Sequence, residues 1–114
     1  MEEQNLEVLM ISPDLTVLQA MDRLNQSDLG GTVFLCEQGV VKASLTDGDV
    51  RRHILSGGSL NEPVRGIANH HFLFLHEDQV AQANDIFDKA KIRSLPVLDI
   101  QGHLVNVITA GLKI

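Results

Sequence analysis

The feature that most limits the possible folds of this chain is an internal repeat. Thr46 ends an apolar stretch at 39–46, and Thr109 ends a matching stretch at 102–109, which lies 63 positions further along the chain. The same offset, without a gap, pairs Val17 with Val80, Ala20 with Ala83, Leu24 with Phe87, Leu35 with Leu98, Gln38 with Gln101 and Gly39 with Gly102. A fixed register with retained apolar character indicates a duplicated structural unit.

Each copy has the same order of expected elements. A short apolar segment precedes a helical pattern, in which positions i, i+3, i+4 and i+7, counted from Val17 or from Val80, form one face. A strand, a tight glycine turn and a second strand follow, and the first copy then has a further expected helix from near Asp47 to about Leu55. In the first copy we expect an initial strand at 8–11, a helix start at Thr16, a strand at 32–36 and a turn that contains Gly39. In the second copy the corresponding features are a strand at 72–75, a helix start at Asp78, a strand at 95–99 and a turn that contains Gly102.

The repeat therefore predicts an α+β fold made of two β-α-β-β-α units. A single unit of this size would be marginally stable, so the units are expected to pack through their sheets with pseudo-two-fold symmetry. We expect the first unit at 6–56, a linker at 57–68 and the second unit at 69–114. Only residues 110–114 follow Thr109, too few for a last helix, so the second unit is expected to be truncated and the natural chain to continue.

Composition and charge disfavour several classes of partner. The chain has 114 residues, of which 44% are hydrophobic, and this suits one domain with a buried core. Its net charge of −6 opposes binding to nucleic acid or to an anionic membrane. An acidic N-terminal sequence, a single cysteine and the lack of a long apolar run point to the cytoplasm.

The stretch 45–53 contains the best candidate ligand site. It follows an expected strand and opens a helix, where free backbone N–H groups and the positive end of the helix dipole attract anions. Thr46 offers a hydroxyl group, and the carboxylate of Asp49 is suited to accept hydrogen bonds from a ribose diol. Either Arg51 or Arg52 is suited to pair with phosphate oxygens. Together these groups suit a nucleotide.

Other interpretations of the same residues remain open. Thr46 and Asp49 also have the spacing of a capping box, in which both side chains only satisfy the helix start. Adjacent arginines usually form a solvated helix face, and at most one of this pair is expected to reach a ligand. In the second copy Leu112 stands in place of the aspartate, so one competent site is expected and not two. Arg93, at the start of a strand of the second copy, is a candidate for added positive charge.

Patterns of catalytic or metal-binding residues are not visible in the sequence. The 5 histidines lack the spacing of a zinc site, and no Ser/His/Asp, paired-carboxylate or phosphate-loop arrangement is found. Cys36 lies in an apolar strand and is expected to be a small buried residue. We therefore expect a regulatory domain fragment, not an enzyme on its own, without catalytic residues, a metal or a required cofactor.

The two-copy layout, with Ser12-Pro13-Asp14 before the first helix and Thr46-x-x-Asp49 after the last strand, resembles a tandem CBS domain pair, or Bateman module. The similarity covers nearly all 114 residues. A narrower match, at 11–14, 45–52 and 58–64, is similar to the N-terminal CBS pair of sugar-phosphate nucleotidyltransferases. A similar Thr-Asp-Gly-Asp-x-Arg-Arg run occurs in CBS pairs behind sugar-phosphate isomerases, but the opening Ser-Pro-Asp favours the nucleotidyltransferase setting.

The resemblance implies an adenosine-type ligand in the cleft between the two units, such as AMP, ADP, ATP or S-adenosylmethionine. It implies that Asp49 holds the ribose and that Thr46 lies near ribose or phosphate. Gly30 and Gly31 depart from many binding copies, which carry a basic or bulky residue there, and this weakens the expected phosphate contact. The full set of candidate nucleotide-binding residues is Leu29, Gly30, Ser44, Thr46, Asp49, Arg52, Arg93 and Thr109.

Two functional hypotheses follow from the resemblance. The first is a regulatory, nucleotide-sensing module of a larger enzyme, a sugar-phosphate nucleotidyltransferase whose catalytic domain follows in the same chain. Binding would tighten the two units and pass that change on. The second is a structural dimerisation module with no ligand, because CBS pairs commonly form disk-like homodimers. Asp49→Ala separates them, since it abolishes nucleotide binding under the first hypothesis and has little effect under the second.

Overall fold

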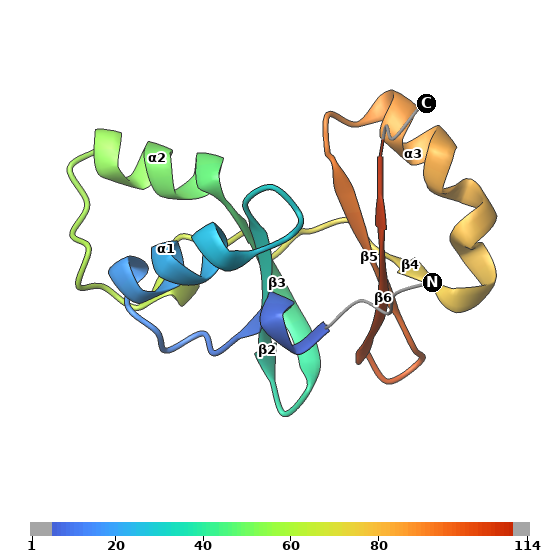
Figure 1. Cartoon of the computed structure of the whole chain (residues 1–114), viewed down its shortest axis with the longest axis horizontal. Coiled ribbons are helices and arrows are strands. Elements are labelled where there is room, and N and C mark those ends of the chain that lie inside the picture. Colours follow the sequence, from blue (N-terminus) through green and yellow to red (C-terminus); the bar gives the residue numbers. More distant parts are fainter. Residues whose placement is uncertain (1–5, 111–114) are drawn as a thin grey trace.

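Two three-stranded sheets lie side by side in the middle of the molecule, with helices on their outer sides (Figure 1). The computed structural model describes residues 6–110. Each sheet combines one parallel and one antiparallel strand pair. The structure therefore confirms the α+β fold predicted from the repeat.

The first unit follows the predicted order of elements closely. Along the chain it contains η1 (Leu6–Leu9, a 3-10 turn), β1 (Met10–Ile11), α1 (Val17–Gln26), β2 (Thr32–Glu37), β3 (Val40–Thr46) and α2 (Asp47–Leu55). Thr16 caps α1, as expected: the backbone N–H of Gln19 donates to Thr16 Oγ1 at 3.1 Å, and the backbone N–H of Thr16 donates to Gln19 Oε1 at 2.9 Å. The chain reverses between β2 and β3 through Gln38 and Gly39, which have φ of 55° and 82°. Positive φ at both positions is typical of a tight two-residue hairpin turn.

The second unit repeats this strand pairing. After a 3-10 turn in the linker, η2 (Val64–Gly66), it contains β4 (Leu75–His76), η3 (Glu77–Gln82, also 3-10), α3 (Ala83–Lys89), β5 (Ser94–Leu98) and β6 (Leu104–Thr109). β4 runs parallel to β5, and β6 runs antiparallel to β5, as in the first sheet. α3 ends 63 positions after the end of α1, and β6 ends 63 positions after the end of β3. The offset found in the sequence therefore also relates equivalent elements of the structure.

The start of the second helix differs from the prediction. Asp78 lies inside η3, and α-helix begins only at Ala83. In the first unit residues 12–16 form a loop between β1 and α1 and supply its cap, whereas η3 follows β4 with no residue between them. Because this loop is missing, the chain enters the helix as a 3-10 turn, and Val80, which was expected on the buried face, is 44% exposed.

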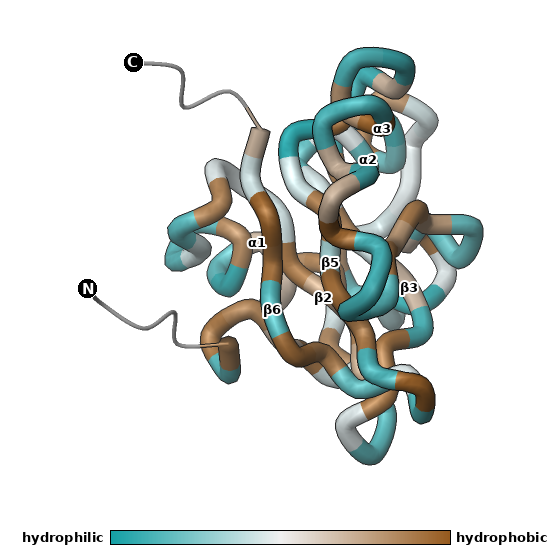
Figure 2. Tube along the Cα trace, turned by 90° about the vertical axis from the view of Figure 1, so that its right-hand side faces the viewer, coloured by the Kyte–Doolittle hydropathy of each residue, from teal (hydrophilic) through white to brown (hydrophobic). Residues whose placement is uncertain are grey.

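The two sheets face each other across a shared apolar core. Phe34 of β2 is 1% exposed and lies in this core with Val41 of β3, Leu98 of β5 and Val107 of β6. Figure 2 shows apolar stretches along the strands in the middle of the molecule and polar segments at its periphery. A second core lies between the first sheet, α1 and α2, and a smaller one lies between the second sheet and α3. The units therefore pack through their sheets, as predicted.

The hairpin turns of the two units make reciprocal contacts. The backbone N–H of Val41 donates to the carbonyl oxygen of Gly102 at 3.0 Å, and Val40 and His103 form an isolated antiparallel bridge. A side chain at Gly39 would meet His103, and a side chain at Gly102 would meet Val40. These two close approaches correspond under the repeat offset, as pseudo-two-fold symmetry requires. Within residues 6–110, no helix has the length and hydropathy needed to cross a bilayer.

Candidate nucleotide cleft

A cleft of about 650 Å³ lies between the two units. Four segments line it: the loop before β2, the end of β3 with the start of α2, the segment 69–73 that precedes β4, and the segment that leads into β5. Its volume falls within the range of roughly 300–1,000 Å³ that is usual for small-ligand sites. Five of the residues predicted from the sequence line this cleft, namely Leu29, Gly30, Ser44, Thr46 and Arg93.

The loop before β2 is held by a local hydrogen-bond network. Ser27 Oγ donates to the carbonyl oxygen of Thr32 at 2.7 Å and accepts from the backbone N–H of Leu29 at 3.1 Å. Gly30 and Gly31 have φ of 71° and 93°, which side-chain-bearing residues adopt only with strain. The carbonyl of Gly31 accepts from the backbone N–H of Asp47 at 3.1 Å, so this loop is attached to the start of α2.

Replacing Gly31 by alanine is expected to destabilise the fold more than the same change at Gly30. A side chain at Gly31 would collide with the carboxylate of Asp47, whereas no atom lies within 4 Å of the corresponding point at Gly30. Gly30→Ala therefore carries only the left-handed strain of about 1–2 kcal/mol, and Gly31→Ala adds displacement of the carboxylate. Urea denaturation of both variants checks this order, and equal losses would contradict the described loop geometry.

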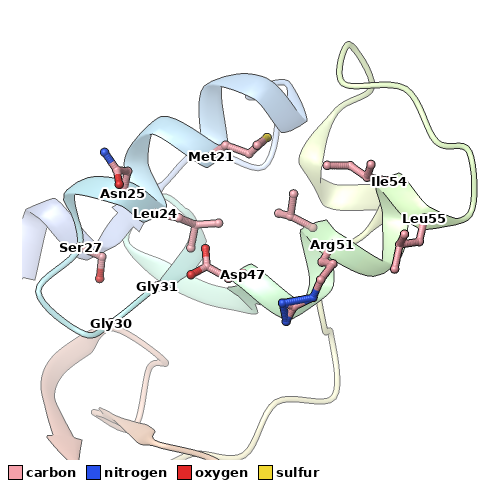
Figure 3. Close-up of a pocket in the computed structure, with 11 residues that line it drawn as sticks. Met21, Leu24, Asn25, Ser27, Gly30, Gly31, Asp47, Arg51, Ile54 and Leu55 are labelled. Carbon is pink, nitrogen blue, oxygen red and sulfur yellow. The ribbon is translucent and has the colours of Figure 1, made fainter.

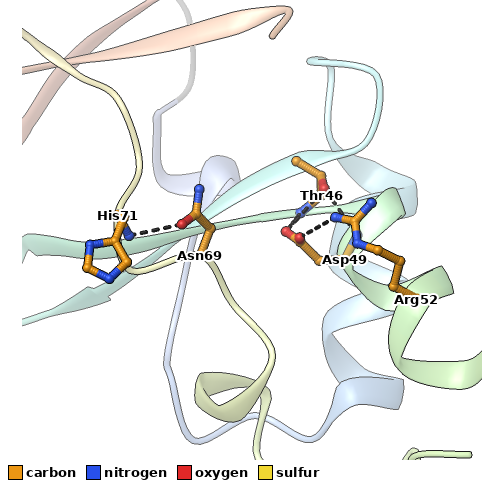
Figure 4. A network of polar contacts seen from close by, with 5 residues as sticks. All are labelled: Thr46, Asp49, Arg52, Asn69 and His71. Carbon is orange, nitrogen blue, oxygen red and sulfur yellow. Dashed lines mark hydrogen bonds and ion pairs between the residues drawn. The ribbon is translucent and has the colours of Figure 1, made fainter. Parts of the chain in front are cut away.

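Thr46 and Asp49 form the capping box at the start of α2. Asp49 Oδ2 accepts from the backbone N–H of Thr46 at 3.0 Å and from Thr46 Oγ1 at 3.1 Å, and the backbone N–H of Asp49 donates to Thr46 Oγ1 at 3.2 Å (Figure 4). The capping interpretation is therefore correct. Thr46 also lines the cleft. Asp49 is not among the cleft-lining residues, and its side chain is 15% exposed.

The two adjacent arginines have different environments. Arg52 donates to Asp49 Oδ1 at 2.8 Å, and its side chain is 73% exposed. Arg51 is the one that lines the cleft. The sequence left open which of them faces the ligand and placed Arg52 in the candidate set. The structure instead puts Arg51 at the cleft wall, because successive residues of a helix point about 100° apart.

The wall from the second unit comes from the segment before β5. Lys91, Arg93 and Pro96 line the cleft there. Thr109, at the end of β6, pairs with Ser94 of β5 and is not among the cleft-lining residues of the described chain. Leu112, on which the expectation of a single competent site rests, lies outside the described residues.

The start of the second unit, before β4, supplies cleft residues that the sequence did not reveal. Asn69 pairs with the edge of β3, with two backbone hydrogen bonds to Ser44 of 3.0 and 2.8 Å. Its side-chain oxygen accepts from the backbone N–H of His71 at 2.9 Å, and Asn69, His71 and Phe72 line the cleft (Figure 4). The strand expected at 72–75 begins only at Leu75, so residues 69–74 form an irregular segment whose position beside β3 had no signal in the sequence.

A second hollow, of about 540 Å³, adjoins the cleft. It lies between α1 and α2, with Met21 and Ile54 on facing sides (Figure 3). Ile54 is 44% exposed and its neighbour Leu55 is 79% exposed. We name this hollow the α1–α2 groove, and its lining is mostly apolar.

Cys36 does not contribute a nucleophile to either hollow. It lies on β2, is partly buried and packs against the core shared by the two sheets. Burial raises the pKa of its thiol to about 11, so the neutral form dominates at physiological pH. The packing role expected from the sequence is confirmed, but Cys36 is partly and not fully buried.

Comparison with known proteins bears on the class of this chain. Residues 64–111 match the family model of the CBS domain. The chain is 35% identical over 94 residues to arabinose 5-phosphate isomerase GutQ of Salmonella typhi, covering 82% of this chain and 29% of the isomerase. It is 28% identical over 107 residues to CBS domain-containing protein YhcV of Bacillus subtilis, covering 92% of this chain and 75% of that protein. The chain thus spans less than a third of the length of GutQ.

Solved structures with the same fold include CBS domain proteins. One is CBS domain protein PAE2072 from Pyrobaculum aerophilum complexed with AMP, with a TM-score of 0.77 and 20% identity, covering 94% of this chain and 87% of that chain. Another is the CBS domain pair of protein MJ0100 in complex with 5′-methylthioadenosine and S-adenosyl-L-methionine, with a TM-score of 0.76 and 16% identity, covering 90% and 84%. The chain therefore has the fold of a tandem CBS domain pair.

Proposed function

We propose that this CBS pair is a regulatory module that binds an adenosine nucleotide in the cleft between its two units. The observation that carries the proposal is the cleft itself, whose walls come from both units and which opens beside the capping box of α2. A ligand that contacts both walls stabilises one arrangement of the units over others, which is the requirement for passing a signal to a neighbouring domain. The proposal divides the chain into units at 6–56 and 69–114 with a linker at 57–68.

Thr46 and Asp49 are proposed to hold the ribose. Each carboxylate oxygen of Asp49 already accepts a hydrogen bond, but Oδ1 accepts only from the guanidinium of Arg52, whose side chain is 73% exposed. Exchange of that partner for a ribose hydroxyl leaves the cap intact, because Oδ2 continues to accept from Thr46. Capping and binding are therefore compatible roles for the same aspartate. Leu29, Ser44 and Gly30 are proposed to enclose the base.

The relatives favour an isomerase as the larger protein. The relatives reported above are an arabinose 5-phosphate isomerase and a CBS domain-containing protein, and they do not support the nucleotidyltransferase setting expected from Ser12-Pro13-Asp14. We propose that the module accompanies a sugar-phosphate isomerase of the GutQ type. Within the proposal, the module works in the cytoplasm, as its sequence suggests.

A thermal-shift panel of AMP, ADP, ATP, GTP and S-adenosylmethionine tests the proposed binding. A ligand present at 100 times its dissociation constant stabilises the folded chain by about 2.7 kcal/mol, which raises the melting temperature by roughly 10 °C for a domain of this size. We expect a rise with at least one adenosine compound and none with GTP. No rise with any compound at millimolar concentration would leave the cleft without a ligand of this class.

A second candidate function, homodimerisation, is favoured by the α1–α2 groove. Ile54 and Leu55 of α2 both line the groove and are 44% and 79% exposed, and an exposed apolar hollow of this kind is typical of an interaction surface. We propose that a second copy of this chain covers this face, whether or not the cleft holds a nucleotide.

Leu55→Glu is expected to convert the dimer to a monomer, since it places a charge in the proposed interface. The matched control is Ile100→Glu, because Ile100 is 94% exposed in the hairpin between β5 and β6, away from the groove. Light scattering coupled to size-exclusion chromatography measures the mass of each variant. A monomeric parent chain, or a loss of the dimer only in Ile100→Glu, would refute this interface.

A further inference from the structure

A hollow of about 370 Å³ lies at the far end of β5 from the cleft between the units. The cleft is lined by the segment that leads into β5, whereas this hollow lies where β5 ends and the β5–β6 hairpin begins (Figure 1). Among the described residues, it shares none with the cleft or with the α1–α2 groove. We name it the hairpin pocket, and its lining residues are His76, Glu77, Asp78, Leu98, Asp99 and Ile100.

An exposed isoleucine belongs to the lining of the hairpin pocket. Ile100 is 94% exposed, the highest value among the large apolar side chains of the described chain. In the first unit the corresponding position, 63 residues earlier, is Glu37, whose carboxylate lies 3.8 Å from the guanidinium of Arg65. Next to the pocket, Phe74 is 41% exposed and contacts His76 edge-on at 5.4 Å. The second hairpin thus has an apolar side chain where the first has an ion-paired one, and exposed apolar side chains around a hollow are typical of a contact surface.

The charged groups of the hairpin pocket, apart from its histidine, are all acidic. Glu77 and Asp78 are exposed in the first turn of η3, and within residues 6–110 their carboxylates make neither a hydrogen bond nor an ion pair. Asp99 Oδ1 accepts from the backbone N–H groups of His103 and Gln101 at 2.9 Å each, which lowers the pKa of this carboxyl group and keeps it charged at neutral pH. Its Oδ2 lies 3.2 Å from His103 Nδ1. Neither a lysine nor an arginine lines the pocket in the described part of the chain.

These features define the chemistry of a fitting occupant. The volume is at the small end of the range of roughly 300–1,000 Å³ for ligand sites, so the pocket suits a side chain or a short segment. Unpaired carboxylates attract a cationic group, and the exposed isoleucine favours an apolar one. Arginine and lysine provide the charge and lay their aliphatic stems along apolar surface. Acidic segments are disfavoured, because the net charge of the chain is −6.

We propose that the hairpin pocket is a docking site for a segment of a partner protein in which an arginine or a lysine stands close to an aliphatic residue. The aliphatic residue contacts Ile100, and the cationic group pairs with the carboxylates of Glu77 and Asp78. Asp99 holds the hairpin in place and adds negative charge. This docking site goes beyond nucleotide binding and does not depend on it.

A phage-displayed library of random heptapeptides, selected on the immobilised full chain, tests the docking site. We expect the enriched peptides to carry an arginine or a lysine close to an aliphatic residue. The affinity of one enriched peptide, synthesised with a fluorophore, is then measured by fluorescence anisotropy. Ile100→Ala and the double variant Glu77→Gln with Asp78→Asn should each weaken binding at least about tenfold, and the double variant should also reduce its salt dependence. The side chains are exposed, so both variants should keep the melting temperature of the parent.

Two matched variants leave the hairpin pocket unchanged. Leu18→Ala truncates a side chain of α1 that is 53% exposed, and Asp85→Asn with Asp88→Asn removes two exposed carboxylates from α3. Both should bind the peptide as tightly as the parent. Enrichment of peptides without a basic residue, a lack of any enrichment, or equal affinity of the parent and the two pocket variants would overturn the docking site. These outcomes say nothing about the cleft, because no nucleotide is present in the experiment.

Discussion

Phe34→Ala is expected to lower the free energy of unfolding by about 3–5 kcal/mol, the usual loss when a fully buried phenylalanine is truncated. Phe34 is 1% exposed and lies in the core that the two sheets share, where Leu98 and Val107 contact it from the second unit. Its removal opens a cavity between the units instead of within one of them. Urea denaturation of the parent and the variant measures the loss.

Phe74→Ala is the control for this experiment. Phe74 is 41% exposed and contacts Phe72 and His76 at ring-centroid distances of 5.6 and 5.4 Å. Truncation there removes a surface contact, so we expect a loss of about 1 kcal/mol or less. Similar losses in the two variants would contradict a shared core between the sheets.

The second large effect is expected on ligand binding. Asp49→Ala should weaken binding of the nucleotide about a hundredfold or more, since it removes the proposed ribose acceptor and leaves the ribose hydroxyls without a charged partner. It should also lower stability by about 1 kcal/mol, because the capping box of α2 loses its acceptor for the backbone N–H of Thr46. Calorimetry measures the first effect and thermal denaturation the second.

The chain contains a matched control for the capping contribution. Gln19 completes the capping box of α1 as Asp49 completes that of α2, accepting from the backbone N–H of Thr16 at 2.9 Å. Gln19 does not line the cleft. Gln19→Ala should therefore lose a similar amount of stability and keep full nucleotide affinity. If both variants lost affinity equally, the effect of Asp49→Ala would be one of folding and not of binding.

The repeat made most of the fold predictable. A constant offset between Thr46 and Thr109 implies that the strands occur in the same order in both units. Together with the matching apolar positions, it predicted two similar sheets that pack against each other. The start of the second helix could not be predicted, because the 63-residue offset does not reveal that the second unit lacks the loop between its first strand and its helix. Leu75 of β4 pairs with Val97, whereas Met10 of β1 pairs with Phe34, so the initial strands correspond at an offset of 65. Asp78 has the composition of a cap, but the short connection gives it no room to act as one.

The cleft was predictable where its residues belong to regular elements. Thr46 ends the strand that the repeat predicted, and Arg93 directly precedes β5, whereas Leu29, Gly30 and Ser44 were implied by the family resemblance. The orientation of Arg51 relative to Arg52 depends on where α2 begins, which spacing alone defines only to within a residue or two. Asn69 and His71 were not predicted as cleft residues, because the segment before β4 has no periodicity and is positioned by the hydrogen bonds of Asn69 to Ser44 of β3.

The most direct test of the account is an amide NMR titration of the isotope-labelled chain with ATP. We predict chemical-shift changes in four segments that are distant in the sequence: 29–32, 44–51, 69–73 and 91–96, which together line the cleft. Changes in both units at the same ligand concentration would establish a single site between them. No changes at millimolar ATP, or changes confined to the α1–α2 groove around Met21 and Leu55, would contradict nucleotide binding in the cleft.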